Sequence, residues 1–196
     1  MNVGRRYTMT NRADEVAATR ERIARAALAL LMSEWYEDVT LSRIASSAGV
    51  SHQTVLNHFQ SKEGVALAAI EIGRQETLSA RSDATPGDVP GAIAALVAEY
   101  ERMGDANVRW AAGAERLGRL AGVLDEARAA HQQWIVTMFG DELPSGARRR
   151  RTVNALHAAT DVYTWKLLRR DLGLSRTETE KTMADLVVGL LQGGQR

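Results

Sequence analysis

The sequence predicts an all-α protein with a small N-terminal helical domain and a larger C-terminal helical domain. Only three of the 196 residues are proline, and strong helix formers such as Ala, Leu, Arg and Glu are abundant. Apolar residues recur at i, i+3, i+4 and i+7 in several segments, which is the spacing of a helix with one buried face. No strand pattern, repeat or low-complexity tract stands out, and the length allows an ample core.

The first twelve residues predict a flexible, basic arm ahead of the folded part. Its Arg5, Arg6 and Arg12 could contact phosphates or a minor groove, although a disordered tail is the more common role of such a terminus. The first helix is then expected from about Asp14 to Glu34. The side chains of its inward face are Ile23, Ala26, Ala27, Leu30 and Leu31.

Two short helices follow, separated by a Gly-Val turn. Thr40 is a good N-cap for a helix that begins at Leu41, and Gly49 can adopt the left-handed backbone that ends this helix. Ser51 then caps the next helix. The pattern is typical of a helix-turn-helix, in which one helix braces and the second enters the DNA major groove.

The second of these helices has a polar face suited to base edges. Val55 and Phe59 point toward the core. The side chains left facing outward are His52, Gln53, Thr54 and Asn57. Lys62 opens the following helix, where a cation is unfavourable for the helix dipole, so it fits a phosphate contact better than a stabilising role. An ordinary pair of packed amphipathic helices has the same spacing, and the pattern alone does not separate the two.

Further motifs flank this segment on both sides. They are Arg22, Ile23, Ala26, Ala27 and Leu30, then Val39-Thr40, Ile44-Ala45, Ala48-Gly49-Val50-Ser51, His58-Phe59 and Ser61-Lys62-Glu63. Together, from about Thr19 to Ile72, they resemble the N-terminal domain of TetR-family transcriptional regulators. The remainder resembles that family only in length and helical pattern. One departure is Leu56, where the family often has a tyrosine whose hydroxyl contacts a phosphate.

The resemblance implies a set of DNA contacts. Six residues on the bracing helix and at the helix ends are expected to contact phosphates or the groove. They are Thr40, Ser42, Arg43, Ser51, His58 and Lys62. Those expected at base edges are His52, Gln53, Thr54 and Asn57. Gln and Asn can pair bidentately with adenine, and the Thr methyl can meet a thymine methyl.

A linking helix is expected from about Ser61 to Arg81. The following Ser79–Pro90 segment, with two of the three prolines, is the clearest break in the chain. We therefore expect an arm (1–12), a helix-turn-helix domain (13–60) and a C-terminal part that includes the linking helix (61–196). Later helices are expected near Gly91–Met103, Ala106–Leu117, Leu120–Phe139, Ala147–Arg170 and Arg176–Leu191, with breaks at Gly104, Gly118, Gly140–Gly146 and Gly173.

The last two expected helices carry stripes suited to self-association. One stripe is Val153, Leu156, Thr160, Thr164 and Leu167, and the other is Met183, Leu186, Val187, Leu190 and Leu191. The same stripes also suit the core of a single chain. The resemblance implies a homodimer that pairs these helices in a four-helix bundle, and its two-fold symmetry would match a palindromic operator.

The resemblance also implies a ligand-binding site in the C-terminal part, mostly apolar with a few polar groups. Its candidates are Tyr100, Met103, Trp110, His131, Trp134, Met138, His157, Asp161 and Tyr163. Trp and Met on amphipathic helices are more often core residues than pocket residues. His157 and Asp161 lie one helical turn apart, so their side chains can pair. The implied function is a ligand-responsive repressor that a small-molecule effector releases from its operator.

Two other functions stay open. One is a DNA-binding dimer without an effector. The other is an enzyme that uses the C-terminal cavity, with His131, His157 or Asp161 as acid or base. No nucleophile motif, phosphate loop or metal-ligand spacing supports an enzyme, so no catalytic residue, cofactor or metal is expected.

Composition limits the kinds of site and the cellular location that the chain can have. The chain has no cysteine, which excludes disulfides, thiolate metal sites and a cysteine nucleophile. The longest apolar run, Ala26–Met32, is too short to cross a bilayer, and no signal peptide is recognisable, so we expect a cytoplasmic protein. The net charge of +1 gives no global basic bias, and a DNA reader needs none if its basic and polar groups cluster on one face.

Overall fold

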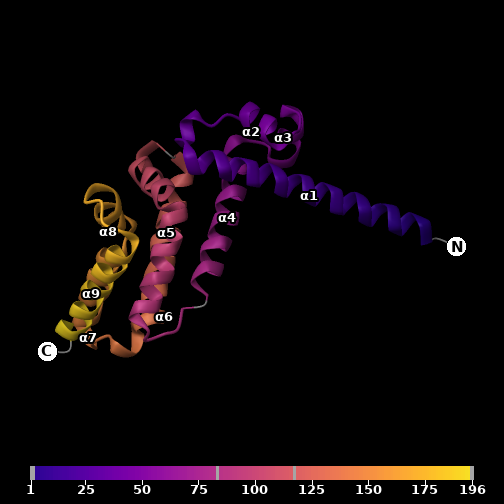
Figure 1. Cartoon of the computed structure of the whole chain (residues 1–196). Helices are drawn as coiled ribbons and strands as arrows, with labels where there is room; N and C mark the ends of the chain where they lie inside the picture. The colour runs from indigo at the N-terminus through magenta and orange to yellow at the C-terminus, as the bar shows by residue number, and fades with distance from the viewer. Residues whose placement is uncertain (1–2, 83, 117, 195–196) are drawn as a thin grey trace. The chain divides into compact units, whose positions relative to one another are not determined.

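The computed structural model describes the chain except for residues 1–2, 83, 117 and 195–196, and the side chains of residues 1–12, 116 and 119 also lie outside the described residues. Helices and turns make up the described part, which contains no strand. The chain divides into an N-terminal unit, Met1–Gln75, and a C-terminal unit, Glu76–Arg196. Figure 1 shows the helices of each unit. The all-α prediction is confirmed.

The described residues of the N-terminal unit form four helices and one 3₁₀ turn. They are α1 (Val3–Ser33), η1 (Tyr36–Asp38), α2 (Leu41–Ala48), α3 (His52–Phe59) and the first part of α4 (Lys62–Arg81). Its core is made of buried apolar side chains from all four helices and from the residue after η1, and includes Ile23, Ala27, Leu31, Val39, Ile44, Val55, Phe59, Val65 and Ala69. The predicted starts of α2 and α3, and their caps, are confirmed.

Helix α1 begins at Val3, earlier than the predicted start near Asp14. It therefore includes the backbone of most of the segment expected to be a flexible arm. Between Arg5 and Ser33 the sequence has no glycine or proline, so no helix breaker interrupts the helix. The side chains of residues 13–18 are all exposed, so this part of α1 contributes no buried side chain to the core of its unit. The mobility of the arm stays a prediction.

The C-terminal unit is built around α5. After the end of α4 its elements are α5 (Val89–Ala112), η2 (Ala114–Arg116), η3 (Gly118–Leu120), α6 (Ala121–Phe139), η4 (Gly140–Glu142), α7 (Gly146–Thr160), α8 (Val162–Lys166), the π-helical turn η5 (Leu167–Asp171) and α9 (Arg176–Gly194). Helix α5 packs against α6, α8 and α9, and α7 packs against α6 and α9. The buried side chains include Leu96, Tyr100, Ile135, Phe139, Leu156, Trp165, Met183, Val187 and Leu191.

Helix α5 passes through Gly104 without a break, so the prediction of two helices in this region was wrong. A Cβ at Gly104 would overlap the ring of Trp165, which is fully buried. The glycine is needed because it lets α8 bring this ring against α5, and not because a helix ends there.

The helix predicted from Ala147 to Arg170 is broken at Asp161, and this prediction also needs correction. The Asp161 backbone is extended (φ −71°, ψ 152°), and its carboxylate accepts a 2.9 Å hydrogen bond from the backbone N–H of Tyr163. Asp161 therefore acts as the N-cap of α8, a role that Asp strongly favours.

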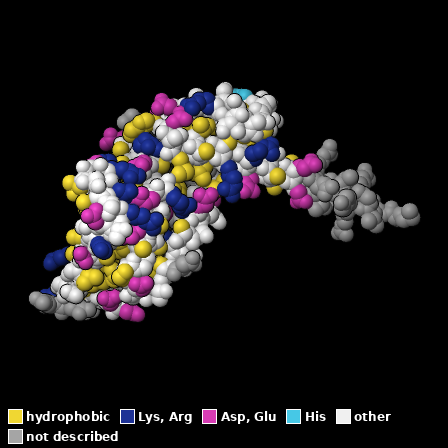
Figure 2. Space-filling model, in the orientation of Figure 1, with side chains coloured by type: hydrophobic (Ala, Val, Ile, Leu, Met, Phe, Trp, Pro, Cys, Tyr) yellow, Lys and Arg dark blue, Asp and Glu magenta, His cyan; other side chains and the backbone are white. Residues whose placement is uncertain are grey.

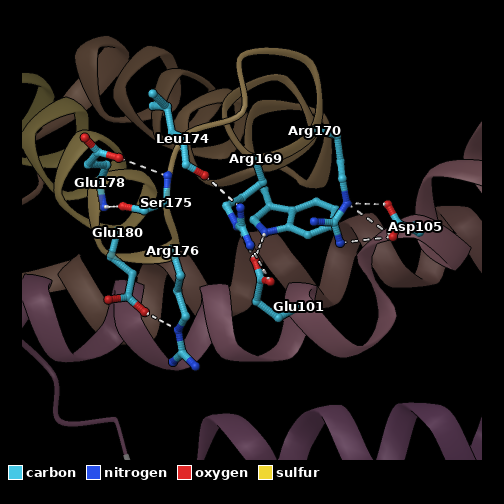
Figure 3. A network of polar contacts seen from close by, with 10 residues as sticks. Glu101, Asp105, Arg169, Arg170, Leu174, Ser175, Arg176, Glu178 and Glu180 are labelled. Carbon is cyan, nitrogen blue, oxygen red and sulfur yellow. Dashed lines mark hydrogen bonds and ion pairs between the residues drawn. The ribbon is translucent and has the colours of Figure 1, made fainter.

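Ion pairs tie α8 and η5 to α5 (Figure 3). The carboxylate of Glu101 accepts hydrogen bonds from Arg169, at 2.6 and 3.0 Å, and from the indole Nε1 of Trp165 at 3.1 Å. These bonds hold the pKa of Glu101 below its usual range. Arg170 lies 4.6 Å from the centre of the Trp165 ring and donates to Asp105. The π-helical turn is thereby held in place by two arginines.

The division between the units falls inside α4, after Gln75, and differs from the boundary expected at residues 60/61 and from the break at Ser79–Pro90. The first half of α4 buries Val65 and Ala69 in the N-terminal unit. Its last turns belong to the other unit, since Thr77 and Arg81 both donate to Glu99 on α5. Helix α4 thus contributes side chains to both units.

Candidate nucleic-acid interface and ligand site

The bracing helix α2 is capped at both ends by local interactions. The Thr40 hydroxyl accepts a 3.3 Å hydrogen bond from the backbone N–H of Arg43. Gly49 ends the helix in the left-handed conformation (φ 65°), and the N–H of Val50 reaches back to the carbonyl of Ala45 at 3.0 Å. These contacts satisfy backbone groups that a short helix leaves open.

Helix α3 presents polar side chains to solvent. Its cap, Ser51, accepts a 3.1 Å hydrogen bond from the backbone N–H of Thr54. His52, Gln53 and Asn57 are exposed. The Gln53 amide donates to the Asn57 carbonyl oxygen at 2.9 Å, so the two amides are paired before any DNA is bound. Each amide can still present a donor and an acceptor to adenine once this bond opens.

The basic side chains beside α3 are bound within the unit. The Arg20 guanidinium lies 4.2 Å from the centre of the Phe59 ring and donates to the carbonyl of His58. Arg22 donates to the carbonyl of Ala48 at 3.1 Å. Both arginines therefore attach α1 to the C-terminal ends of α2 and α3.

Arg43 and Lys62, two of the predicted DNA contacts, are also engaged. Arg43 forms an ion pair with Glu34, and this hydrogen bond lowers the pKa of Glu34 and raises that of Arg43. Lys62 donates to the carbonyl of Glu37 at 3.2 Å and lies 4.2 Å from the centre of the Tyr36 ring, and its partial burial lowers its pKa. In the free protein Lys62 thus has a stabilising role, which the argument from the helix dipole had not assigned to it.

Residues 59–64 form the α3–α4 corner. Gln60 has a positive φ of 66° without being glycine, and the N–H of Ser61 donates to the carbonyl of Phe59 at 2.7 Å across it. This is a γ-turn, a strained conformation for a residue with a side chain. A Cβ at Gly64 would overlap the carbonyl oxygen of Phe59, so the start of α4 lies directly against the end of α3.

Inside the C-terminal unit, charged and hydrogen-bonding side chains form the polar cluster of Arg81, Glu99, Tyr100, His131 and Thr160. Arg81 and Glu99 form an ion pair whose side chains are only 12% and 2% exposed. Nη1 of Arg81 lies 3.2 Å from Nδ1 of His131, and the Tyr100 hydroxyl donates to the carbonyl of Thr160 at 3.0 Å.

The tautomer of His131 follows from this network. Arg81 can only donate, so Nδ1 of His131 must accept. Nε2 then carries the proton and donates to the Thr160 hydroxyl at 2.9 Å, and that hydroxyl donates to the carbonyl of Leu156 at 2.7 Å. Burial, followed by the positive charge of Arg81 and by electrostatic repulsion from the neighbouring His157, lowers the pKa of His131 to about 3, which keeps the ring neutral.

Two aromatic side chains extend the cluster toward the surface. Trp134 stacks on His131 with ring centres 5.5 Å apart. The rings of His131 and His157 meet edge to face with their centres 4.9 Å apart. The buried Nε1 of Trp134 and Nδ1 of His157 have no hydrogen-bond partner among the described residues. Such atoms are costly to leave unpaired, which makes them attachment points for a water molecule or a ligand.

An open groove of about 540 Å³ lies where α6, α7 and α8 meet. His157 forms part of its wall, with Nε2 3.6 Å from a carboxylate oxygen of Asp161. The lining residues are Arg128, Gln132, Asn154, His157, Ala158, Asp161, Tyr163 and Thr164. This lining offers a guanidinium group, two amides and a phenol to a polar ligand.

No group of three or more metal-ligating side chains is found in the part of the chain that the structure describes. A helix long and apolar enough to cross a membrane is likewise absent from the described residues.

Comparison with known proteins assigns the N-terminal unit. The profile of the bacterial regulatory proteins of the tetR family matches residues 23–69, which contain all of α2 and α3 with their caps. The helix-turn-helix domain belongs to the TetR family. The predicted family resemblance is confirmed for this segment.

Two relatives extend the comparison. The HTH-type transcriptional regulator TcmR from Streptomyces glaucescens is 36% identical over 72 residues, which are 37% of this chain and 32% of TcmR. The chain therefore matches about a third of that relative's length. The crystal structure of a transcriptional regulator from Rhodococcus sp. Rha1 covers 90% of this chain and 98% of its own, with a TM-score of 0.73 at 18% identity. The fold around the TetR-family domain is thus shared over most of the chain.

Within the TetR-family domain, the predicted DNA contacts lie on α2, α3 and the start of α4. The exposed ones are Thr40, Ser42, Arg43, Ser51, His52, Gln53 and Asn57, and the half-buried ones are Thr54, His58 and Lys62. Leu56 is half-buried as well, between the two faces of α3. The assignment of these residues to DNA contacts stays a prediction.

Outside the TetR-family domain, the predicted pocket residues separate into two groups. Tyr100, His131 and Trp134 belong to the polar cluster or stack on it, whereas His157, Asp161 and Tyr163 line the groove. The structure does not unite the remaining candidates with either group: Met138 packs in the core, Met103 lies beside Thr77, and Trp110 lies in the last turn of α5.

The expected site was mostly apolar, and the sequence argument missed Arg81 and Glu99. The sequence did hold a signal for Glu99. It lies on the same helical face as Ala92 and Leu96, and a carboxylate on such an apolar face needs a buried partner.

The stripes predicted for self-association also separate. The side chains buried in the core of this chain are Leu156, Thr160, Met183, Val187 and Leu191. Val153, Thr164 and Leu190 are half-buried. Only Leu167 and Leu186, at 50% and 45% exposure, present large apolar surfaces to solvent. Those two, and not the buried five, can contribute fully to an interface with a second copy.

Proposed function

We propose that the protein is a sequence-specific DNA-binding transcriptional regulator, a repressor that a small-molecule effector releases from a palindromic operator. The observation that carries the proposal is α3, a capped helix in a TetR-family domain with exposed His52, Gln53 and Asn57. The description of TcmR as an HTH-type transcriptional regulator supports it.

Selection of bound sequences from random DNA tests the proposal. We expect an enriched palindrome whose half-sites are about one helical turn, 10–10.5 bp, or a multiple of it apart, as two copies of α3 on a two-fold axis require. Recovery of no enriched sequence would remove the DNA-reading function. An enriched site without two-fold symmetry would remove the palindromic operator.

The double variant Gln53→Ala/Asn57→Ala should lose sequence preference and keep weak, salt-sensitive binding. Each bidentate amide contact to adenine contributes about 1–3 kcal/mol of discrimination, while non-specific binding depends on charge, which the variant leaves unchanged. Fluorescence anisotropy on the selected site and on a random duplex measures the ratio of the two Kd values. Gln133→Ala, at an exposed position on α6, is the matched control. An equal loss on both duplexes would contradict base reading by these amides.

A homodimer through α9 is part of the proposal. Leu186 is exposed on this helix, and a Cβ added at Gly189 would meet no atom within 4 Å. Glycine inside a helix is less stable than alanine by about 1 kcal/mol, and no described atom of this chain lies close enough to require it at that position. Close approach of a second copy of α9 would account for the glycine at this position. Leu167 on η5, which packs beside α9, is also exposed and would add to the same interface.

Leu186→Arg should convert the dimer to a monomer and weaken operator binding, because it places a charge in an apolar interface. Sedimentation equilibrium measures the mass, and anisotropy measures binding. The control is Leu78→Arg, an equally exposed leucine at 52% on α4. A variant that stays dimeric would place the interface elsewhere.

The effector is proposed to occupy the groove. Its wall residue His157 contacts His131, and His131 contacts Arg81, the last residue of the helix that begins directly after α3. A ligand that favours one arrangement of this chain of contacts would shift the population that binds DNA.

A metabolite library screened by thermal shift should yield a polar compound that raises Tm and also lowers operator affinity. Asn154→Ala/Tyr163→Ala, which removes an amide and a phenol from the wall, should reduce the rise in Tm for that compound. Gln133→Ala again serves as the control. A library in which every stabilising compound leaves operator affinity unchanged would favour a DNA-binding dimer without an effector.

A further inference from the structure

We infer that α3 reads A·T base pairs, so that each operator half-site has A·T pairs at the positions that Gln53, Thr54 and Asn57 face. The amides of Gln53 and Asn57 would bind adenine, and the Thr54 methyl would contact the methyl group of thymine. The inference rests on the proposed DNA-binding function and adds to it the chemical class of the operator.

The amide side chains of Gln53 and Asn57 form one unit on the exposed face of α3. The Gln53 amide nitrogen donates to the Asn57 carbonyl oxygen at 2.9 Å, across one turn of the helix. This bond leaves the Gln53 carbonyl oxygen to accept and the Asn57 N–H groups to donate. Adenine is the base whose major-groove edge offers a donor, N6–H₂, beside an acceptor, N7. The pair holds both partners for adenine on side chains that are already ordered, which reduces the entropic cost of binding.

Thr54 has a hydroxyl group and a methyl group, and its hydroxyl group is engaged within α3. The hydroxyl oxygens of Ser51 and Thr54 lie 2.8 Å apart and share a hydrogen bond. Ser51 also accepts from the backbone N–H of Thr54 at 3.1 Å, so this contact lies at the cap of the helix. A base that bound the Thr54 hydroxyl would compete with the Ser51 bond, whereas a base that contacted the methyl would not. The group of a base edge that takes an apolar contact is the C5-methyl of thymine.

The side-chain types that read G·C pairs are absent from α3. Guanine is read most often by Arg or Lys, and cytosine by Asp or Glu. Residues 52–59 include none of these four types. On the face shown in Figure 2, the surface over α3 has few charged side chains. His52 does not alter this preference, because a neutral imidazole has one donor and one acceptor and fits either kind of pair.

The basic side chains that flank α3 are bound to other groups of the unit. Arg43 donates to both carboxylate oxygens of Glu34, and Lys62 donates to the carbonyl of Glu37 at 3.2 Å. Arg20 on α1 donates to a carbonyl in the last turn of α3. To read guanine, each of these cations would have to give up an interaction, which reduces its net contribution to binding. This arrangement leaves base discrimination to the side chains of α3, and so favours A·T pairs.

Base analogues test the inference on the site that selection from random DNA yields. Uracil in place of thymine removes only the C5-methyl, and 7-deazaadenine in place of adenine removes only the N7 acceptor. At one or more half-site positions we expect uracil to weaken binding about fourfold, which is the effect of one buried methyl. At others we expect 7-deazaadenine to weaken binding about fivefold or more. Fluorescence anisotropy with the full chain measures Kd for each duplex.

Variants of the protein assign each effect to a side chain. Thr54→Ser removes the methyl and should bind the thymine and uracil duplexes equally. Thr54→Val is the matched control, because it keeps a methyl, lacks the hydroxyl and should still prefer thymine. Gln53→Ala/Asn57→Ala should bind the adenine and 7-deazaadenine duplexes equally. Its retained preference for thymine over uracil would show that α3 is still folded and bound in the groove.

Three outcomes would contradict the inference. Enriched half-sites with G·C pairs at their specified positions, or equal binding of natural and analogue duplexes, would overturn it and leave the proposed function in place. Sensitivity to the analogues that persists in Thr54→Ser and in Gln53→Ala/Asn57→Ala would also overturn it, because other side chains would then read the A·T pairs. Recovery of no enriched sequence would instead overturn the proposed function, and the inference with it.

Discussion

Replacing Glu99 by alanine should lower the free energy of unfolding by about 3–5 kcal/mol, because it leaves the charge of Arg81 buried without its carboxylate. The two side chains are 12% and 2% exposed, so bulk water solvates the remaining guanidinium poorly. Arg81 also holds Nδ1 of His131, and the loss should extend into the polar cluster. Urea denaturation followed by circular dichroism measures the change.

The control for this prediction is Asp125→Ala, which removes the carboxylate from an ion pair with Arg128 whose side chains are 80% and 56% exposed. Exposed pairs contribute about 0–1 kcal/mol, so this variant should differ little from the unaltered chain. Equal destabilisation by the two substitutions would mean that burial does not set the strength of the Arg81–Glu99 pair.

Stability should also fall as the pH is lowered, and His131 should account for a large part of the decrease. Its pKa is about 3 in the folded chain and 6.5 in a solvated histidine, so between these values the unfolded state binds a proton that the folded state does not. Its contribution to stability is therefore complete above pH 6.5 and is lost as pH falls toward 3, at up to about 1.4 kcal/mol per pH unit.

Denaturation at several pH values compares the unaltered chain with His131→Gln, which cannot titrate at this position. The pH dependence should be shallower in the variant within that window. Glu71, whose pKa is lowered to about 2 by hydrogen bonds from Arg74 and Gln75, acts in the same direction at lower pH, but it is present in both proteins and cancels in the difference. His52→Gln, at an exposed position, is the control. Parallel curves for the unaltered chain and His131→Gln would show that His131 does not titrate as its burial requires.

The N-terminal unit was predictable because its signals are local. Thr40 and Ser51 cap the residues directly after them, and Gly49 turns the chain within a few residues, so spacing alone gave the ends of α2 and α3. The partners of Arg43 and Lys62 were not predictable in the same way. Both depend on where the end of α1 and the turn η1 lie beside α2 and α4.

The C-terminal unit was predictable as helices but not as a site. Gly104 indicates a helix break when only the sequence is read, but α5 continues through it, and the glycine is explained by the close approach of the Trp165 ring from far along the chain. Asp161 indicates a partner for His157 one turn away, yet it also caps a new helix. The Arg81–Glu99 pair joins two helices across a connecting segment, and no spacing rule predicts which buried charges will meet.

The α3–α4 corner has a consequence for engineering. Its geometry depends on the Phe59 carbonyl, the γ-turn at Gln60 and the absence of a side chain at Gly64. None of these depends on the side chains at His52, Gln53 or Asn57, which are exposed on the same helix. Under the proposed function, the outward positions of α3 should therefore be exchangeable as a set to alter DNA sequence preference, while Phe59 and Gly64 must be kept so that the corner keeps its geometry.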